Sequence, residues 1–393
     1  MQSIFILGRQ PAIGRAELES LLGADHVQPL GDNAMLSDIP PEAINFARLG
    51  SSVKLARYLD TVSSTDWRTV QDALPTLVRT AADAISEGKI QLGISSYDMR
   101  VNPKQLLAAG LTLKKSLRQA GYSVRLTPNQ EAELSSAQVL HNHLTGDRGI
   151  ELVIIRHGAQ TVVGRTVAIQ DITAYARRDQ ERPKRDAFVG MLPPKLAQTI
   201  INLATGPLET SAEHVVLDPF CGTGVVLQES LLMGYGAYGT DLEPRMIDYS
   251  RQNLAWLSEK HGTTTEPPLE VGDATTFTWQ HPFTTVACET YLGHPLATWP
   301  RPDKLQQIIG TCNLIIEKFM RNIGTQLPAG TRLCLAVPAW KAPNGTIHHL
   351  PLLDHLEKMG YNRVSLRHVA PSDLVYYRPE QTVARELLVI TRK

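Results

Sequence analysis

A glycine-rich turn in the second half of the chain has the composition of a ligand-binding loop. It lies within VVLDPFCGTGVVLQESLLMGYGAYGTDLEP, residues 215–244. The turn runs from Pro219 to Gly224 and is expected to open directly into a helix. Gly222 and Gly224 allow a ligand to approach the backbone closely, and the helix N-terminus points unpaired N–H groups toward it. The turn therefore predicts a site for a small polar ligand.

Three acidic residues define the chemistry of that ligand. Asp218 ends the strand before the turn, Asp241 ends the next strand, and Asp273 follows a further strand. Because the G-x-G-x-x-G spacing is absent and an acid before the turn repels a pyrophosphate, the pattern disfavours a nicotinamide dinucleotide. A cofactor with an amino group and a cationic centre suits the same acids. We therefore predict S-adenosylmethionine, with its methionine end at Asp218, its ribose at Asp241 and its adenine amine at Asp273.

The expected cofactor contacts combine the turn with the residues that follow the second and third acids. They are Asp218, Pro219, Phe220, Cys221, Gly222, Gly224, Asp241, Leu242, Asp273 and Ala274. Cys221 is not expected to act as a nucleophile. The four cysteines of the chain form no C-x-x-C pair and no cluster with histidine, so the sequence predicts no metal site.

Several segments resemble one enzyme family. DPFCGTG resembles the first motif of class I methyltransferases, particularly those that modify nucleic acids. RDAFVGMLPPKLAQ, residues 185–198, resembles the opening of the catalytic domain in THUMP-containing tRNA guanine-N2 methyltransferases, and residues 375–390 resemble its last hairpin. FILGRQPAIGRAELESLL resembles the N-terminal ferredoxin-like domain of the same family. The resemblance implies an enzyme that methylates guanine N2 in tRNA, with guanosine ten the favoured target.

The expected catalytic segment departs from the family pattern. The resemblance implies an Asp- or Asn-Pro-Pro-aromatic tetrapeptide after the fourth strand, which holds the amine hydrogens and stacks on the splayed base. Here that strand leads into Glu289-Thr290-Tyr291-Leu292-Gly293, without the two prolines. We expect Glu289 to accept a hydrogen bond from the amine and Tyr291 to stack on the base. Two alternatives stay open: a DNA adenine-N6 methyltransferase, which shares the cofactor turn, and a cofactor- and tRNA-binding protein without catalysis.

The elements that position these residues alternate between strand and helix from residue 190 onward. Such alternation predicts an α/β fold in which a parallel sheet is covered by helices on both faces. The family resemblance implies that this part is a Rossmann-like class I methyltransferase domain. Ligands in such sheets bind beyond the carboxyl ends of the strands. Together with this pattern, the resemblance implies four segments: a ferredoxin-like α+β domain at 1–88, a THUMP RNA-binding domain at 89–170, a surface linker at 171–189 and the methyltransferase domain at 190–393.

Hydrophobic periodicity gives the expected elements within each segment. Helices are expected, among other places, at residues 40–49, 103–120 and 350–359. Strands are expected, among other places, at residues 3–7 and 384–391.

Charge is unevenly distributed although the formal net charge is zero. Residues 101–200 carry 14 basic and 8 acidic side chains, whereas the segments on either side are mildly acidic. A cationic middle segment favours contact with a polyanion and agrees with tRNA as the partner. The expected phosphate contacts are Lys114, Lys115 and Arg118 on one helix, and Arg182, Lys184 and Arg185 in the linker.

Composition excludes several other classes of protein. With 42% hydrophobic and 20% charged residues, the chain has material for a large core and is not expected to be disordered. The N-terminal MQSIFILGRQPAIG lacks a basic region and a long apolar run, and no apolar stretch approaches the ~18 residues that span a bilayer. We therefore expect a cytoplasmic protein with no signal peptide and no membrane association.

Overall fold

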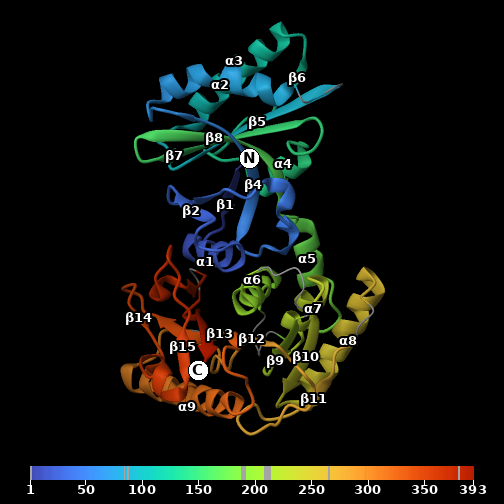
Figure 1. Cartoon of the computed structure of the whole chain (residues 1–393), viewed down its shortest axis with the longest axis vertical. Coiled ribbons are helices and arrows are strands. Elements are labelled where there is room, and N and C mark those ends of the chain that lie inside the picture. The colour runs from blue at the N-terminus through green and yellow to red at the C-terminus, as the bar shows by residue number, and fades with distance from the viewer. Residues whose placement is uncertain are drawn as a thin grey trace. The chain divides into compact units, whose positions relative to one another are not determined.

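The computed structural model describes residues 2–83, 85, 88–186, 192–207, 214–263, 266–296, 298–378 and 381–393 (Figure 1). They cluster into two compact units. The first unit comprises Met1–Arg15, Ala24–Ala47 and Ser51–Thr173, and the second comprises Ala16–Gly23, Arg48–Gly50 and Ala174–Lys393. The segments at 185–198 and 375–390 that carry part of the family resemblance lie partly outside the described residues.

One eight-stranded sheet runs through the first unit, in the order β2-β3-β1-β4-β8-β7-β5-β6. Its strands are β1 (Ser3–Leu7), β2 (Val27–Leu30), β3 (Ala34–Ser37), β4 (Ser52–Val62), β5 (Lys89–Tyr97), β6 (Ser123–Leu126), β7 (Gly149–His157) and β8 (Gln160–Ile169). Its helices are α2 (Trp67–Ala82), α3 (Pro103–Gln119) and α4 (Ser136–His141), while α1 (Pro11–Leu22) and α5 (Ile172–Gln180) have residues in both units. The segments predicted as ferredoxin-like and THUMP domains thus share one sheet, and a boundary near residue 88 stays a prediction.

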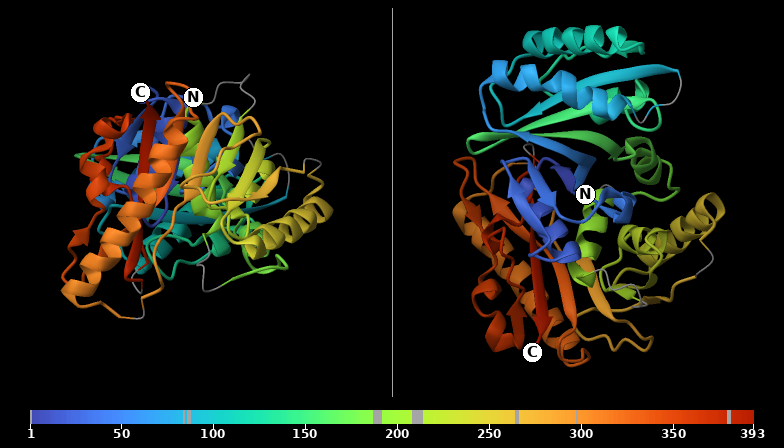
Figure 2. Two further views of the ribbon diagram at one scale, coloured as in Figure 1. Left: turned by 90° about the horizontal axis from the view of Figure 1, so that it is seen from below. Right: turned by 45° about the horizontal axis from the view of Figure 1, so that its top comes forward.

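Helices α2 and α3 cover the same face of this sheet (Figures 1 and 2). Leu74 of α2 and Leu113 of α3 are buried in one cluster with Ile90 of β5. Helix α3 begins where the sequence predicts, because Asn102 and Gln105 exchange side-chain to backbone hydrogen bonds of 3.0 Å at its first turn.

A nine-stranded mixed sheet forms the centre of the second unit, with the main order β11-β10-β9-β12-β13-β17-β15. Its strands are β9 (Val215–Asp218), β10 (Gly236–Asp241), β11 (Leu269–Val271), β12 (Thr285–Glu289), β13 (Arg332–Lys341), β14 (Ile347–His348), β15 (Tyr361–Arg363), β16 (Val375–Tyr376) and β17 (Val383–Arg392). Its helices are α6 (Pro194–Thr205), α7 (Val225–Leu232), α8 (Pro244–His261) and α9 (Pro302–Gly324).

The sheet is mixed and not parallel throughout as predicted. Strands β9 to β13 are parallel to one another, whereas β17 runs antiparallel between β13 and β15. A parallel connection needs a long crossover, usually a helix. The described chain between β15 and β17 contains only the short 3₁₀ helix Pro371–Asp373 and β16, so β17 returns in the opposite direction.

Helices cover both faces of this sheet, which confirms the predicted α/β layering. Leu227 of α7 and Ile247 of α8 pack in one cluster with Ala237 of β10. Phe319 of α9 packs in a second cluster with Val286 of β12. The three layers leave the carboxyl ends of the parallel strands side by side at one edge, where a ligand site is expected.

Three predicted elements take a different form. The predicted helices at 40–49 and 350–359 are wrong, because each position holds two short 3₁₀ helices instead. Ile44 is extended (φ −97°, ψ 117°) and His355 has φ −126°, so neither segment can continue as an α-helix. The segment predicted as a surface linker contains α5, whose Tyr175 is buried.

No helix in the described ranges is long and apolar enough to cross a lipid bilayer. Among the same residues, no three His, Cys, Asp or Glu side chains are arranged to hold a metal ion.

Candidate active site

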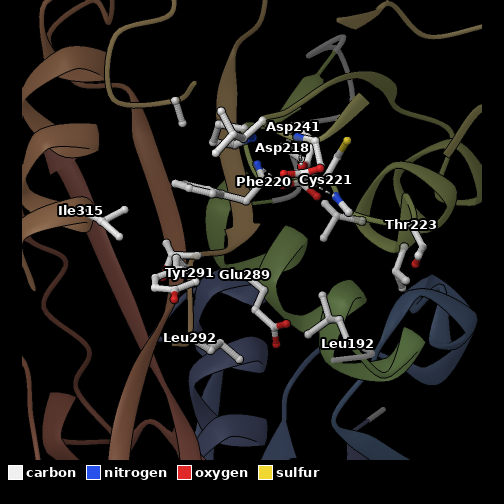
Figure 3. Close-up of a pocket in the computed structure, with 18 of the residues that line it drawn as sticks. Leu192, Asp218, Phe220, Cys221, Thr223, Asp241, Glu289, Tyr291, Leu292 and Ile315 are labelled. Carbon is white, nitrogen blue, oxygen red and sulfur yellow. Dashed lines mark hydrogen bonds between the residues drawn. The ribbon is translucent and has the colours of Figure 1, made fainter. Parts of the chain in front are cut away.

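A cavity of about 460 Å³ lies at the carboxyl ends of β9, β10 and β12 in the second unit (Figure 3). Nine of the predicted cofactor residues line it: Asp218, Pro219, Phe220, Cys221, Gly222, Asp241, Leu242, Asp273 and Ala274. The predicted catalytic residues Glu289 and Tyr291 line the same cavity. Its volume is in the range of small-molecule sites. The structure therefore brings two sets of residues, predicted from separate patterns, around one cavity.

Two backbone N–H groups of the glycine-rich turn donate hydrogen bonds to the neighbouring strand. The Cys221 N–H donates to the Thr240 carbonyl at 3.0 Å, and the Gly222 N–H donates to Asp241 Oδ2 at 2.8 Å. Gly224 begins helix α7 with φ +82°, and a Cβ there would lie 2.9 Å from the Ser250 hydroxyl. Gly224 is not a lining residue, so its contribution is to shape the turn around the cavity.

Asp218 is a buried acid, and among the residues that the structure describes no cation forms an ion pair with it. The residue is 2% exposed, and its Oδ1 accepts a hydrogen bond of 3.1 Å from the Phe220 N–H. Burial raises the pKa of Asp218 well above its usual range, and the carboxylates of Asp241 and Glu289 raise it further. A ligand that brings a cationic group to this wall of the cavity would relieve that cost.

Asp241 is oriented by two backbone donors at the end of β10. Its Oδ2 accepts from Gly222 and its Oδ1 accepts from the Glu243 N–H at 3.0 Å. Burial raises the pKa of Asp241 as well. The next residue, Leu242, is 62% exposed and presents an apolar side chain at the cavity. A polar group next to an apolar wall suits a nucleoside, whose ribose carries hydroxyls and whose base is flat and apolar on its faces.

Asp273 lies in the loop after β11. Its Oδ1 accepts hydrogen bonds from the Thr275 N–H at 2.9 Å and the Thr275 hydroxyl at 2.8 Å. Ala274 beside it is buried. This loop therefore supplies a fixed acceptor near the rim of the cavity.

Glu289 forms an ion pair that the sequence did not predict. Its Oε1 accepts from Arg385 Nε at 2.6 Å, and the two side chains are 14% and 8% exposed. Arg385 lies on β17, about a hundred residues further along the chain. Glu289 thus lines the cavity while its carboxylate forms an ion pair with Arg385.

The residues after Glu289 turn without the two prolines of the family pattern. The Thr290 N–H and hydroxyl both donate to the Ala336 carbonyl, at 3.0 and 3.2 Å. Gly293 has φ +82°, where a Cβ would lie 3.3 Å from Cys312 Sγ. Tyr291 between them is half-buried against the core, and burial raises its pKa (Figure 3). A strand-end hydrogen bond and a glycine hold the aromatic side chain at the cavity wall.

Cys221 has the properties of a structural residue. It is 5% exposed, and the Ser250 hydroxyl lies 3.8 Å from its sulfur. Burial and the nearby acids raise the pKa of the Cys221 thiol well above its usual range. A thiol that stays protonated is a poor nucleophile, which agrees with the expectation that Cys221 does not act as one.

The predicted phosphate contacts fall into different parts of the structure. Lys115 and Arg118 are exposed on α3 of the first unit, and Lys114 is half-buried there. Lys184 and Arg185 belong to the second unit, where Lys184 Nζ lies 5.3 Å from the centre of the Tyr249 ring.

Arg182 is not displayed at the surface as the sequence predicted. It is 3% exposed, and its Nη2 donates to Asp179 Oδ1 at 3.4 Å. Burial lowers the pKa of the Arg182 guanidinium. The preceding helix α5 covers a side chain that a linker would expose, so Arg182 is no longer a candidate for a phosphate contact.

Sequence reasoning missed several residues of the site. Arg385 is the most informative, since its partner depends on which strand lies next to β13. Leu192, Thr223 and Ile315 also line the cavity. Thr223 lies within the glycine-rich turn and could have been included from its position, whereas Ile315 comes from α9 and carries no local signal.

Comparison with known proteins agrees with this geometry. A family model described as a DNA methylase matches residues 105–252, less than half of the chain. The chain is 41% identical over 78 residues to a tRNA (guanine(10)-N2)-dimethyltransferase of Methanothermobacter thermautotrophicus, covering 19% of this chain and 22% of the relative. It is 38% identical over 84 residues to the protein of the same name from Pyrococcus abyssi, covering 21% and 22%. The matches thus span about a fifth of the length of these relatives.

The likeness to solved structures extends over the whole chain. TrmN from Thermus thermophilus superposes with a TM-score of 0.52 at 15% identity, covering 100% of both chains. The fold is therefore an α/β fold of the class I methyltransferase type with mixed sheets.

Proposed function

We propose that this chain is an S-adenosylmethionine-dependent methyltransferase that modifies guanine N2 in tRNA, with guanosine ten the favoured target. The observation that carries the proposal is the single cavity that holds Asp218, Asp241, Asp273, Glu289 and Tyr291. The partial matches to proteins named tRNA (guanine(10)-N2)-dimethyltransferases support the choice of substrate.

The cavity fits the proposed cofactor. Asp218 would hold the cationic amino group, because burial and the nearby acids disfavour the charged form of its carboxyl group and a cation would favour that form. Asp241, already fixed by two N–H donors, would accept the ribose hydroxyls. Asp273 would accept from the adenine amine, with Leu242 and Ala274 beside the ring. When bound, S-adenosylmethionine supplies an electrophilic methyl group.

Glu289 and Tyr291 would prepare the target base. Methylation of an exocyclic amine is difficult because the nitrogen lone pair is delocalised into the ring. Glu289 would accept a hydrogen bond from the amine and fix the direction of its lone pair, while Tyr291 stacks on the splayed base. Glu289 can take this role without the Pro-Pro pair because Arg385 and the Thr290 backbone already fix the segment.

The first unit would bind the RNA. We propose that residues 1–88 form a ferredoxin-like domain and residues 89–170 a THUMP domain, joined to the methyltransferase domain of residues 190–393. The excess of basic residues in the middle of the chain supports this division. Lys114, Lys115 and Arg118 would contact phosphates from the first unit, and Lys184 and Arg185 would do so from the second.

The test is methyl transfer from labelled S-adenosylmethionine to tRNA transcripts. We expect incorporation into transcripts with guanosine at position ten, recovered as N2-methylated guanosine, and loss of incorporation when that position is adenosine. A duplex DNA substrate is the necessary comparison, because the matching family model is described as a DNA methylase. Transfer to adenine in DNA, with none to tRNA, would replace our proposal by the DNA methyltransferase alternative.

A further inference from the structure

We propose that Arg385 is a positioning residue for methyl transfer, because its guanidinium holds the Glu289 carboxylate in the orientation that meets the target amine. This inference rests on the proposed function of the cavity. It assigns a task in the reaction to a residue on β17, a strand that supplies none of the predicted site residues.

The sheet brings the two side chains together across one strand. Strands β12 and β17 both pair with β13, on which Glu289 lies opposite Ala336 and Arg385 opposite Pro338. Ala336 and Pro338 are two residues apart, so their side chains and those of their partners lie on the same face of the sheet. Because the intervening side chains are short, the long side chains of Glu289 and Arg385 can meet above β13.

The contact has the geometry of a fixed ion pair. Arg385 Nε donates to Glu289 Oε1 at 2.6 Å, and Arg385 Nη1 lies 3.4 Å from the Gln381 amide oxygen. Arg385 is 8% exposed, so nearly all of its side chain is covered by the protein. A guanidinium held at two points presents a rigid donor, which limits the rotation of the carboxylate it binds.

The ion pair divides the tasks of the carboxylate between its two oxygens. Oε1 is engaged by Arg385, while Glu289 also lines the cavity. We infer that Oε2 is the oxygen that accepts from the amine. Without Arg385 the carboxylate could rotate or withdraw from this position, and a displacement of about 1 Å can reduce a rate ~10²-fold.

Arg392 provides a matched control on the same strand. Its Nε donates to the Gly324 carbonyl at 2.8 Å and its Nη1 to the Gly360 carbonyl at 2.7 Å. Arg392 is half-buried and does not line the cavity. Arg392→Met should lower the melting temperature while leaving the rate of methyl transfer unchanged.

A double-mutant cycle tests the assignment, with full-length protein, S-adenosylmethionine and tRNA. Arg385→Met should lower kcat ~10-fold or more with little change in cofactor affinity, and Arg385→Lys should recover part of the loss. In the Glu289→Gln background the same Arg385→Met change should cost less than about 3-fold, because the carboxylate it orients is gone. An equal loss in both backgrounds would show that Arg385 acts independently of the Glu289 carboxylate and would overturn the inference.

Crystal structures with bound cofactor give a readout that does not depend on turnover. We expect the Glu289 carboxylate to move by about 1 Å or more in Arg385→Met relative to the wild type. An unmoved carboxylate would overturn the inference even if the enzyme is active. A wild-type protein that methylates no RNA would instead refute the proposed function, and the two crystal structures would still decide the positioning role of Arg385.

Discussion

Replacing Asp218 by asparagine should stabilise the protein without cofactor and weaken cofactor binding at the same time. Burial raises the pKa of Asp218 well above its ordinary value of 3.8. The folded state therefore keeps this proton at pH values where the unfolded chain has released it. The free energy of unfolding consequently falls as pH rises above about 3.8, and Asp218→Asn removes that loss while its amide oxygen keeps the Phe220 hydrogen bond.

The two effects have opposite signs and comparable sizes. A buried polar group without its partner costs about 1–3 kcal/mol, which sets the expected gain in stability near neutral pH. In a domain of this size each kcal/mol corresponds to about 2–4 °C in melting temperature. A hydrogen bond to a charged group contributes about 1.5–3 kcal/mol, so cofactor affinity should fall roughly 10- to 150-fold.

Thermal unfolding between pH 5 and 8, combined with calorimetric titration of S-adenosylmethionine, measures both effects. Asp218→Asn should unfold at a higher temperature than the wild type, with the difference growing as pH rises. Asp273→Asn is the control, since Asp273 is exposed and should change stability little. A lower melting temperature at pH 8, or an unchanged cofactor affinity, would refute the reasoning that Asp218 is a buried acid reserved for a cationic ligand.

Three further predictions follow from the site and the charge distribution. Gly224→Ala should lower the free energy of unfolding by about 1–3 kcal/mol in denaturant titration, because φ is +82° and the added carbon would meet the hydroxyl of a serine on α8. Unchanged stability would show that this backbone conformation does not require glycine. Asp241→Ala should weaken cofactor binding about 5- to 150-fold by calorimetry, and an unaffected variant would place the ribose elsewhere. The double change Lys115→Gln with Arg118→Gln should reduce the slope of log affinity for tRNA against log salt by up to about 1.8, whereas Arg182→Gln should leave that slope unchanged because the side chain is buried.

Local signals explain which parts of the fold the sequence predicts well. Strand β1 has the predicted bounds, and α3 ends one residue before the predicted limit. The Asn102 capping box and Pro103 at the first helical position define its start within a few residues. The glycine-rich turn is also predicted from local sequence, because the positive φ of Gly224 favours glycine whatever the rest of the chain does.

Long-range pairing explains what the sequence does not predict. Arg385 lies in a segment whose apolar pattern predicts a strand, but nothing near it in sequence says that β17 runs antiparallel beside β13. Its contact with Glu289 depends on that register. Arg182 is the opposite case. Its polar neighbours in sequence predict an exposed side chain, but the packing of α5 buries it. Side chains whose role is set by another strand or helix thus lie beyond single-sequence reasoning.

The central claim is methylation of guanine N2 in tRNA, and nucleoside mass spectrometry of tRNA from cells lacking this protein tests it most directly. The account predicts that N2-methylated guanosine at position ten disappears in such cells, returns with the wild-type gene, and does not return with Glu289→Ala. An unchanged amount of N2-methylated guanosine in cells without the protein, or full restoration by Glu289→Ala, would contradict it.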